Sequence, residues 1–509
     1  MMEPAANRTR DWIYPAATLF AAAVLGAASV WMGGLNQDEG WYLYAANMVG
    51  EGRMPYRDFF YTQGPVMPLV YSAFTWVWKS WGMLGARIFT LLAGFVGIGF
   101  AAALARRLAP AGRGRAAALT VLMLVGCNIY HLYFVTIPKT YALAALFVSV
   151  GFYLMSFGGN AAGRLQKAAW SGAGLSLAFA AGTRISLGAL LAVAGLWLVS
   201  ARRWKALVFF SIGGFAGLVF SYLPFLIDGE SLKGLCAAQR YHASRGGFDA
   251  VWCVGSLSRL VRWYTPLFVI GGLGVFMRPA AADRGDTGET SRSVLSIAVW
   301  GIAAVFTVQV LAPFPYEDYQ VPIMGLAAAA AAAVYARRGD PDASDGALLL
   351  PVLGMTFACS FGSPLLEKWT TNGQDRFWTL KKEKTEMAQL RDVAKRIERL
   401  DPGGRTLLTQ DVYLAIETGR SVPRGLEMGP FSMLTDGEWR RLLTETAPRE
   451  CAVAALSGYA FAVEPPECTE RPVDRQMEYW HLLKKNFRLA DREESFGQNA
   501  TTLLILKRK

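Results

Sequence analysis

Long apolar runs alternate with short polar connections along most of this chain. A helix needs about 20 apolar residues to cross a bilayer, and eleven runs approach or reach that length. They cover residues 13–35, 84–105, 116–135, 141–157, 168–181, 185–199, 206–227, 263–276, 294–311, 321–335 and 347–361. A further apolar stretch, 64–81, is short and contains prolines, so we expect helix lying along the membrane interface there. The pattern predicts an α-helical polytopic membrane protein.

The pattern changes after residue 361. Residues 381–400 have helical periodicity, and 479–487 also favour a helix. Strand-like apolar runs occur at 406–409, 452–463 and 501–506. Mixed short helices and strands are typical of a small α/β domain. We therefore predict two domains, a membrane domain over residues 1–361 and an α/β domain over residues 362–509.

Composition agrees with this division. The 509 residues are 53% hydrophobic and only 18% charged, too apolar for an ordinary soluble enzyme. The net charge of +12 comes from Lys and Arg placed mainly between apolar runs and in residues 362–509, which we call the tail. This placement is not that of a nucleic-acid-binding surface, so no nucleic-acid partner is expected. Basic residues mark alternate loops near 106–115, 164–167, 202–205, 278 and 337–338 as cytoplasmic. An odd number of spans then places residues 362–509 on the extracytoplasmic side.

Two adjacent carboxylates, Asp38 and Glu39, follow the first apolar run directly. A carboxylate at membrane level is costly unless it is paired or faces a wet cavity, so the two acids are candidates for function. The structural alternative is that Asp38 simply caps the helix that follows it.

Other polar side chains are expected on the same face of the membrane, further along the first loop and in three later loops. They are Arg57, Asp58, Gln63, Lys139, Arg184, Tyr316, Glu317 and Asp318. Arg and Lys bind phosphate, and a nearby carboxylate can take a proton from an attacking hydroxyl. Acids and cations together at a lipid interface therefore indicate a reaction on an anionic lipid head group.

Each of these residues also has a structural interpretation. The Lys139 and Arg184 side chains could snorkel from span ends. The Arg57–Asp58 pair could fix its own loop, and Glu317 and Asp318 could solvate theirs. Arg87 begins a span, where we expect an interfacial anchor.

Several familiar sites are missing from the sequence. It has no Walker loop, no dinucleotide fingerprint and no Gly-x-Ser-x-Gly elbow. It has no Cys-x-x-Cys pair and only three histidines, so no metal site is predicted. We expect no cofactor.

Four short motifs resemble those of a known enzyme class. They are Asp38-Glu39-Gly40-x-Tyr42 after the first helix, the segment 55–60 (PYRDFF), and Gln63-Gly64-Pro65 before the interfacial helix, with Gly85-Ala86-Arg87 opening the next span. Together they resemble the membrane glycosyltransferases of the GT-C fold, in particular bacterial relatives of protein O-mannosyltransferases and lipid A aminoarabinose transferases. The likeness is good over residues 10–110 and continues in topology to about residue 361.

The resemblance implies an inverting glycosyltransferase in a bacterial inner membrane, working on the periplasmic side. A hexosyl or pentosyl group would pass from a polyprenyl-phosphate donor to a hydroxyl of a lipid, glycan or protein acceptor. Asp38 matches the general base and Glu39 its neighbour, while Lys139 and Arg184 are the cations expected to hold phosphate. The aminoarabinose transferases have a Lys where this chain has Gln63-Gly64, which leaves the phosphate ligand open.

Two alternatives accompany this interpretation. Some enzymes with the fold use a metal, which Asp38, Glu39 and Asp318 would hold here. A transporter or flippase of lipid-linked sugars is the alternative function, and such proteins have paired halves and ionisable groups near span midpoints. This sequence shows neither feature.

Overall fold

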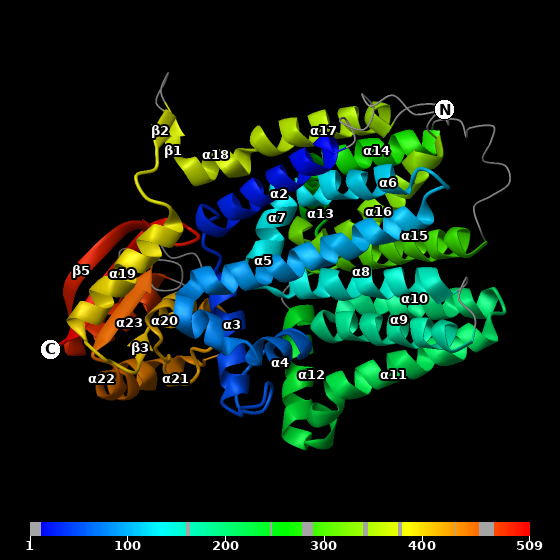
Figure 1. Ribbon diagram of the computed structural model, residues 1–509. Helices are drawn as coiled ribbons and strands as arrows, with labels where there is room; N and C mark the ends of the chain where they lie inside the picture. Colours follow the sequence, from blue (N-terminus) through cyan, green and yellow to red (C-terminus); the bar gives the residue numbers. More distant parts are fainter. Residues whose placement is uncertain are drawn as a thin grey trace.

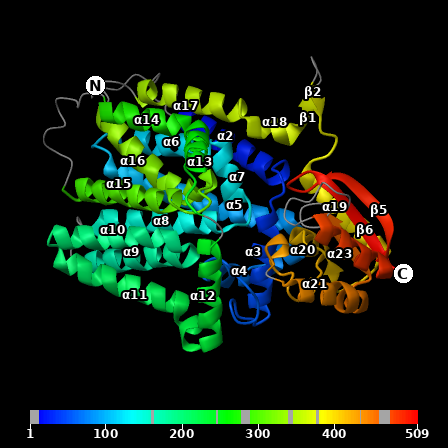
Figure 2. The same cartoon turned by 180° about the vertical axis from the view of Figure 1, so that it is seen from behind.

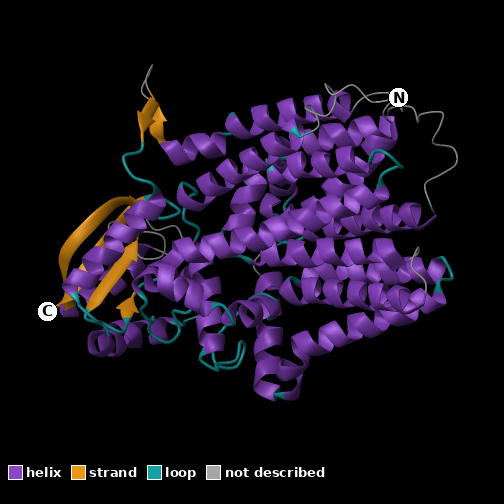
Figure 3. Cartoon of the chain, in the orientation of Figure 1, coloured by secondary structure: helices purple, strands orange, loops and turns teal. Residues whose placement is uncertain are grey.

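The computed structural model describes residues 12–158, 163–244, 247–276, 289–338, 345–374, 379–432, 434–457 and 473–509. Long helices run side by side through most of the molecule, and a small sheet with its own helices lies at one end of them (Figures 1 and 3). The long helices are α2 (Ile13–Trp31), α5 (Thr75–Leu108), α8 (Thr140–Gly158), α9 (Gly163–Thr183), α11 (Trp204–Ile227), α15 (Glu289–Val310), α16 (Val321–Arg338) and α17 (Asp345–Phe361).

Shorter helices fill and flank this bundle. They are α3 (Gln37–Gly50), α4 (Val66–Ser72), α6 (Gly114–Val121), the π-turn η1 (Leu122–Gly126), α7 (Ile129–Thr136), η2 (Ile185–Leu187), α10 (Gly188–Ser200), α12 (Gly229–Ser244), α13 (Ala250–Trp263), α14 (Thr265–Phe276), η4 (Glu317–Gln320) and α18 (Pro364–Thr370).

The predicted apolar runs are helical over most of their length, and the chain is a multi-pass membrane protein. Within the described residues, seven helices are long and apolar enough to cross a membrane, or eight if one bent pair counts as a span. Helices α10 and α14 are apolar but shorter than a span. Length and composition therefore identify fewer spans among the described residues than the eleven that the sequence predicts.

The bent pair corrects one predicted span. Residues 116–135 were predicted as one span, but the helices there are two pieces, α6–η1 and α7, that meet at an angle of 70°. Asn128 stands at the break, and its side chain accepts a hydrogen bond from the His131 backbone N–H at 2.9 Å. Asn is a favoured N-cap because its side chain satisfies a free backbone donor. The polar cap starts a new helix inside an otherwise apolar run.

The predicted interfacial helix over residues 64–81 also consists of two pieces. It comprises α4 and the first turns of α5, which kinks at Gly82. Gly82 has φ +62°, a conformation that glycine adopts without steric cost. A carboxylate oxygen of Glu417, from the tail, accepts the next backbone N–H, that of Met83, at 2.7 Å.

The tail is an α/β domain, as predicted. Its four-stranded sheet has the order β3-β4-β6-β5, in which β3 pairs with β4 in parallel and the other pairs are antiparallel. Strand β5 was missed in the sequence because its central residues are polar and largely exposed. The sheet strands are β3 (Leu407–Leu408), β4 (Val453–Ser457), β5 (Phe487–Phe496) and β6 (Thr501–Arg508).

Helices surround this sheet, and a separate hairpin precedes it. The predicted helix 381–400 begins only at Glu386, because residues 379–381 form a strand of the hairpin. The remaining tail elements are β1 (Thr371–Gln374), β2 (Thr379–Lys381), α19 (Glu386–Leu400), α20 (Val412–Thr418), η5 (Gly429–Phe431), α21 (Asp436–Arg441), η6 (Leu442–Thr446), α22 (Ala447–Glu450) and α23 (Val473–Asn486).

Two hydrophobic clusters hold the molecule together. One lies within the helix bundle and extends to Trp369 on α18. The other joins the tail to the membrane domain, because Trp41 and Tyr42 of α3 pack in the same cluster as Val412 and Tyr413 of α20. Both views of the ribbon place α3 between the bundle and the tail (Figures 1 and 2). The helix that carries Asp38 and Glu39 is thus packed against both domains.

Candidate active site

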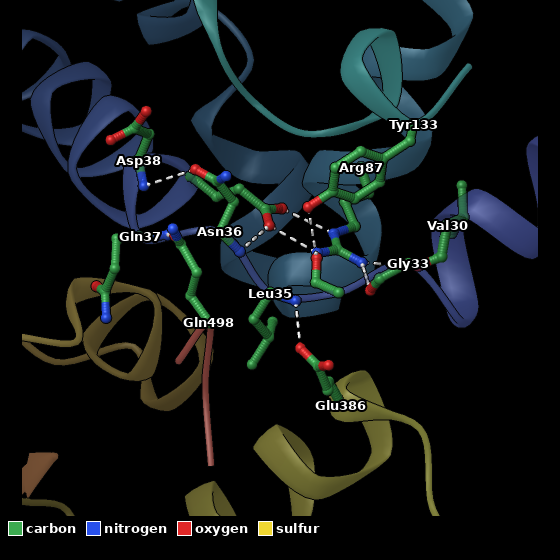
Figure 4. Close-up of polar contacts among 12 residues, drawn as sticks. Val30, Gly33, Leu35, Asn36, Gln37, Asp38, Arg87, Tyr133, Glu386 and Gln498 are labelled. Atoms are coloured by element: carbon green, nitrogen blue, oxygen red, sulfur yellow. Dashed lines mark hydrogen bonds and ion pairs between the residues drawn. The ribbon is translucent and has the colours of Figure 1, made fainter. Parts of the chain in front are cut away.

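The start of α3 is fixed by a capping box. Asn36 is the N-cap: its side chain accepts from the Asp38 backbone N–H at 3.0 Å, and Glu39 accepts from the Asn36 backbone N–H at 2.9 Å (Figure 4). This reciprocal pattern satisfies two backbone donors that would otherwise be free. The alternative that Asp38 is the cap is therefore wrong, since Asn36 takes that position.

The Asp38 carboxylate faces a cavity of about 430 Å³, called here the main cavity. One carboxylate oxygen lies 2.7 Å from Lys139 Nζ, and the other accepts from the Trp41 indole N–H at 3.1 Å. Its side chain remains 26% exposed, so it stays open to the cavity. The main cavity is lined by Asn36, Gln37, Asp38, Trp41, Tyr42, Thr62, Gln63, Tyr130, Tyr133, Phe134, Lys139, Tyr141, Arg184, Tyr241, Trp263, Tyr316, Glu317, Asp318, Tyr319, Leu365, Met428 and Gln498.

Lys139 stands between two carboxylates. Besides Asp38, its ammonium lies 3.4 Å from Asp318 on η4, which also accepts from the Tyr141 hydroxyl at 2.8 Å. Burial alone would lower the pKa of Lys139, but Asp38 and Asp318 outweigh that effect, and its pKa lies well above the ordinary value. Lys139 is thus a buried, paired ammonium rather than a side chain snorkelling toward the membrane surface.

Glu39 points in a different direction from Asp38. Its two carboxylate oxygens lie 2.6 and 2.7 Å from Arg87 nitrogens, and both side chains are fully buried. Arg87 also donates to the backbone carbonyls of Gly33 and Gly34, each at 2.8 Å. Arg87 is therefore an internal tie between the end of α2, α3 and α5 instead of the interfacial anchor that its position predicted. Figure 4 shows the Asp38 carboxylate and Arg87 on opposite sides of Asn36.

Arg184 lies at the boundary between the main cavity and a smaller one. Its guanidinium donates to the Thr140 hydroxyl at 3.1 Å and lies about 5 Å from the ring centroids of Tyr141 and Tyr319. The side chain is buried, and its Nε has no hydrogen-bond partner among the described residues. The Arg184 Nε–H is therefore available to donate a hydrogen bond to a ligand, while the rings of Tyr141 and Tyr319 hold the guanidinium in place.

The smaller cavity, the side pocket, has a volume of about 200 Å³. Among the described residues, no Asp, Glu or Lys lines the side pocket, and Arg184 is the single charged residue in its wall. Its lining residues are Thr62, Gln63, Gly64, Arg184, Ile185, Ser186, Gln239, Val308, Gln309, Ala312, Pro313, Phe314 and Tyr319. Gln309 is buried, and its amide oxygen lacks a partner within the described structure. The side pocket therefore combines one cation and neutral polar groups with an apolar wall.

The three residues of the predicted turn, Tyr316, Glu317 and Asp318, all line the main cavity. Asp318 contacts Lys139, whereas Glu317 pairs with Arg259 of α13 at 3.1 Å. Gln63 lines both cavities. The polar positions from four separate loops are thus brought together around the main cavity.

Arg57 and Asp58 lie apart from this group. They pair with each other at 2.9 Å and line a separate hollow of about 250 Å³ between the first loop and the tail. The hydrogen bonds from Arg57 and from the Met54 backbone lower the pKa of Asp58 to about 2. The structural alternative, a local ion pair, is confirmed, and neither residue lines the two cavities.

The acids do not gather as metal ligands. Within the described ranges, no three His, Cys, Asp or Glu side chains form a group that could hold a metal ion. Asp38 and Asp318 flank Lys139, and both oxygens of Glu39 are bound by Arg87. The set Asp38, Glu39 and Asp318 is therefore not brought together.

The sequence did not single out several residues of this site. Burial and the Asp38 carboxylate raise the pKa of the Tyr42 phenol, which lines the main cavity. Gln498 and Met428 reach the same cavity from the tail. Spacing along the chain gives no signal for tail residues that lie more than 350 positions from Asp38.

No protein-family model and no curated protein matches this sequence. Solved structures do match in three dimensions. ArnT from Cupriavidus metallidurans bound to undecaprenyl phosphate has 14% identity and a TM-score of 0.62, covering 97% of this chain and 98% of ArnT. The apo form of that ArnT has 15% identity, 98% coverage of both chains and a TM-score of 0.61.

An archaeal protein matches more distantly. The oligosaccharyltransferase of Archaeoglobus fulgidus, tethered to an acceptor peptide, has 11% identity and a TM-score of 0.52. The match covers 96% of this chain and 74% of that one. The chain has the GT-C fold. The resemblance inferred from the sequence motifs is confirmed at the level of the fold, and the structural match extends through the tail.

Proposed function

We propose that this GT-C protein is a membrane glycosyltransferase that moves a sugar from a polyprenyl-phosphate donor to an acceptor hydroxyl. The observation that carries the proposal is the meeting of two unlike cavities at Arg184. The main cavity holds Asp38 on its wall, and the side pocket offers a cation without acids. If the donor lay across Arg184, its sugar would be in the main cavity near the base Asp38, and its phosphate would be in the side pocket.

The side pocket suits the phosphate end of an isoprenoid lipid. Arg184 has an unused buried donor, and guanidinium binds phosphate well. The apolar wall formed by Ile185, Val308 and Ala312 gives an isoprenoid chain a path away from the polar cavity. ArnT, which shares the fold, has been seen with undecaprenyl phosphate. Lys139, on the main-cavity side, is the second cation for the phosphate.

The chemical step follows from these positions. Asp38 accepts the proton of the acceptor hydroxyl, whose oxygen forms a bond to the anomeric carbon of the donor sugar. The bond from that carbon to the phosphate oxygen breaks on the opposite face, which inverts the anomeric configuration. The electron pair leaves with polyprenyl phosphate, whose charge Arg184 and Lys139 stabilise. We place this reaction on the periplasmic side of a bacterial inner membrane, with a hexose or pentose as the sugar and a lipid, glycan or protein as the acceptor.

Replacing Asp38 by Asn tests the proposal. Purified protein in nanodiscs would be given undecaprenyl-phosphate pentose and hexose donors with candidate acceptors, and release of undecaprenyl phosphate measured. Asp38→Asn should lower kcat by about 10²–10⁴-fold, the usual contribution of a general base. Asp58→Asn is the matched control, since the same change there lies outside both cavities and should leave turnover near the wild-type value.

Full activity of Asp38→Asn would disprove the base assignment. Movement of a lipid-linked sugar across a vesicle membrane without transfer would instead support the alternative, a transporter or flippase.

A further inference from the structure

Side chains of the tail bind the segment that leads into α3, the helix that carries Asp38. A carboxylate oxygen of Glu386 accepts from the Leu35 backbone N–H at 2.7 Å, and the side-chain oxygen of Gln498 accepts from the Gln37 backbone N–H at 2.9 Å. Figure 4 shows Glu386 and Gln498 approaching this turn from the tail. Leu35 precedes α3 and Gln37 is its first residue, and tail side chains satisfy both backbone donors.

A third contact is fully enclosed. Asp411 accepts from the Gln37 side-chain amide at 2.6 Å and from the Tyr413 hydroxyl at 2.8 Å. Asp411 is 1% exposed, and Gln37 is also buried. A buried carboxylate is held in place by its hydrogen bonds, since losing one leaves a desolvated group unsatisfied.

The backbones themselves are in contact one turn further on. Gly40 of α3 lies so close to α20 that a Cβ added there would come within 2.2 Å of the Tyr413 backbone nitrogen. Glycine at this position permits that approach. Helix α3 is therefore clamped on the tail side by both hydrogen bonds and backbone packing.

The same domain forms part of the cavity wall. Gln498 and Met428 line the main cavity together with Asp38. The tail thus contacts the reacting space and holds the helix that carries the base.

We propose that Asp411 is a positioning residue, which holds Gln37 and through it the adjoining Asp38 in the geometry for proton transfer. The tail is then part of the catalytic site rather than a separate appendage. This inference rests on the proposed function, because it concerns the placement of its base.

The effect should appear in the rate more than in donor binding. Gln37 and Asp38 are consecutive, so a small rotation of the helix start moves the Asp38 carboxylate relative to an acceptor. A misplacement of about 1 Å can cost about 10²-fold in rate. Arg184, the proposed phosphate ligand, lies between α9 and η2, where it contacts Thr140, Tyr141 and Tyr319 rather than the start of α3.

Three full-length variants test the proposal. Asp411→Ala should lower kcat by about 10–100-fold while the donor KM changes by less than about threefold. Asp411→Asn keeps an oxygen for Gln37 and Tyr413 and should restore most of kcat. Glu417→Ala is the matched control, because it removes another tail carboxylate that docks on the membrane domain, at Met83, away from Asp38. Its kcat should stay within about threefold of wild type.

Hydrogen–deuterium exchange of residues 33–44 supplies a readout that needs no activity. Exchange should be faster in Asp411→Ala than in Glu417→Ala or wild type. An unchanged kcat in Asp411→Ala, or an equal loss in Glu417→Ala, would overturn the positioning role. If the wild type transfers no sugar, the proposed function fails, and equal exchange in the two variants would then separately overturn the inference.

Discussion

Asp38 and Glu39 are neighbours in sequence, yet they belong to two unlike regions. Successive residues of an α-helix point about 100° apart, so the two carboxylates leave α3 on different sides. Glu39 enters a closed ion pair in which Arg87 occupies both oxygens and no surface is exposed. Asp38 enters an open cluster in which one cation serves two acids beside a cavity.

This contrast indicates which carboxylate can take part in chemistry. A fully paired, fully buried carboxylate has no direction from which a substrate can approach, and it serves to hold α2, α3 and α5 together. A carboxylate with an exposed side can exchange its partner for a substrate hydroxyl. Glu39 therefore acts in our proposal by fixing the helix on which Asp38 is mounted.

The largest expected effect comes from breaking the closed pair. Arg87→Met should lower the free energy of unfolding by about 3–5 kcal/mol, because it leaves the Glu39 carboxylate buried without a partner. Denaturant unfolding of the detergent-solubilised protein measures this loss. The double variant Glu39→Gln with Arg87→Met should recover part of the stability, and additive losses would contradict the pairing.

A smaller effect is expected at the cation between the cavities. Arg184→Gln should weaken binding of undecaprenyl phosphate by about 10–100-fold, the value of a hydrogen bond to a charged group. A fluorescent or radiolabelled lipid binding assay in nanodiscs measures this change. Stability should fall less than in Arg87→Met, because Arg184 has no carboxylate partner to leave unpaired among the described residues. Unchanged lipid affinity would remove Arg184 from the phosphate site.

The open cluster should respond to pH in a defined direction. The pKa of Lys139 is raised in the folded protein, so the stability it adds is fully present below its unfolded pKa of about 10.4. That stability should be lost as pH rises beyond this value toward the folded pKa. The difference in Tm between wild type and Lys139→Met should therefore be constant from about pH 7 to 9 and shrink above about pH 10.4. A difference that shrinks already near neutral pH would show that the cluster does not hold Lys139 charged.

The smallest effect is expected at the exposed ion pair. Arg57→Gln should leave the free energy of unfolding close to the wild-type value, since solvent screens the Arg57–Asp58 pair. It should leave lipid binding unchanged, which makes it the matched Arg control for both Arg87→Met and Arg184→Gln. A loss comparable with that of Arg87→Met would mean that exposure is not what separates the two kinds of pair.

Much of the fold could be predicted from the pattern of residues. Apolar runs located the helices because a membrane segment needs only length and hydropathy, and the tail was recognised by its mixed periodicities. The bend before α7 was missed because Asn128 interrupts a run that is otherwise apolar. Strand β5 was missed because an exposed, charged strand lacks an apolar face, and it was recognisable only from its pairing with β6.

The site could be predicted in part. The polar loops at Asp38, Lys139, Arg184 and Asp318 were assigned to one face, and they do line one cavity. Arg87 was misjudged because its partner lies 48 residues away, and a span end looks the same from sequence whether it faces lipid or protein. Asp411 and Gln498 were not considered, because nothing local in the tail indicates contact with residue 37.

The membrane-spanning helices, the α/β tail and the set of polar side chains available for chemistry can all be inferred from the order of residues. These follow from local composition, which needs no knowledge of distant residues. Three-dimensional packing, in contrast, determines that Asp38 faces a cavity while Glu39 pairs with Arg87. It also determines that the tail contacts the turn between α2 and α3. Those assignments depend on which distant side chain arrives within hydrogen-bond distance, and packing of the whole chain sets that distance.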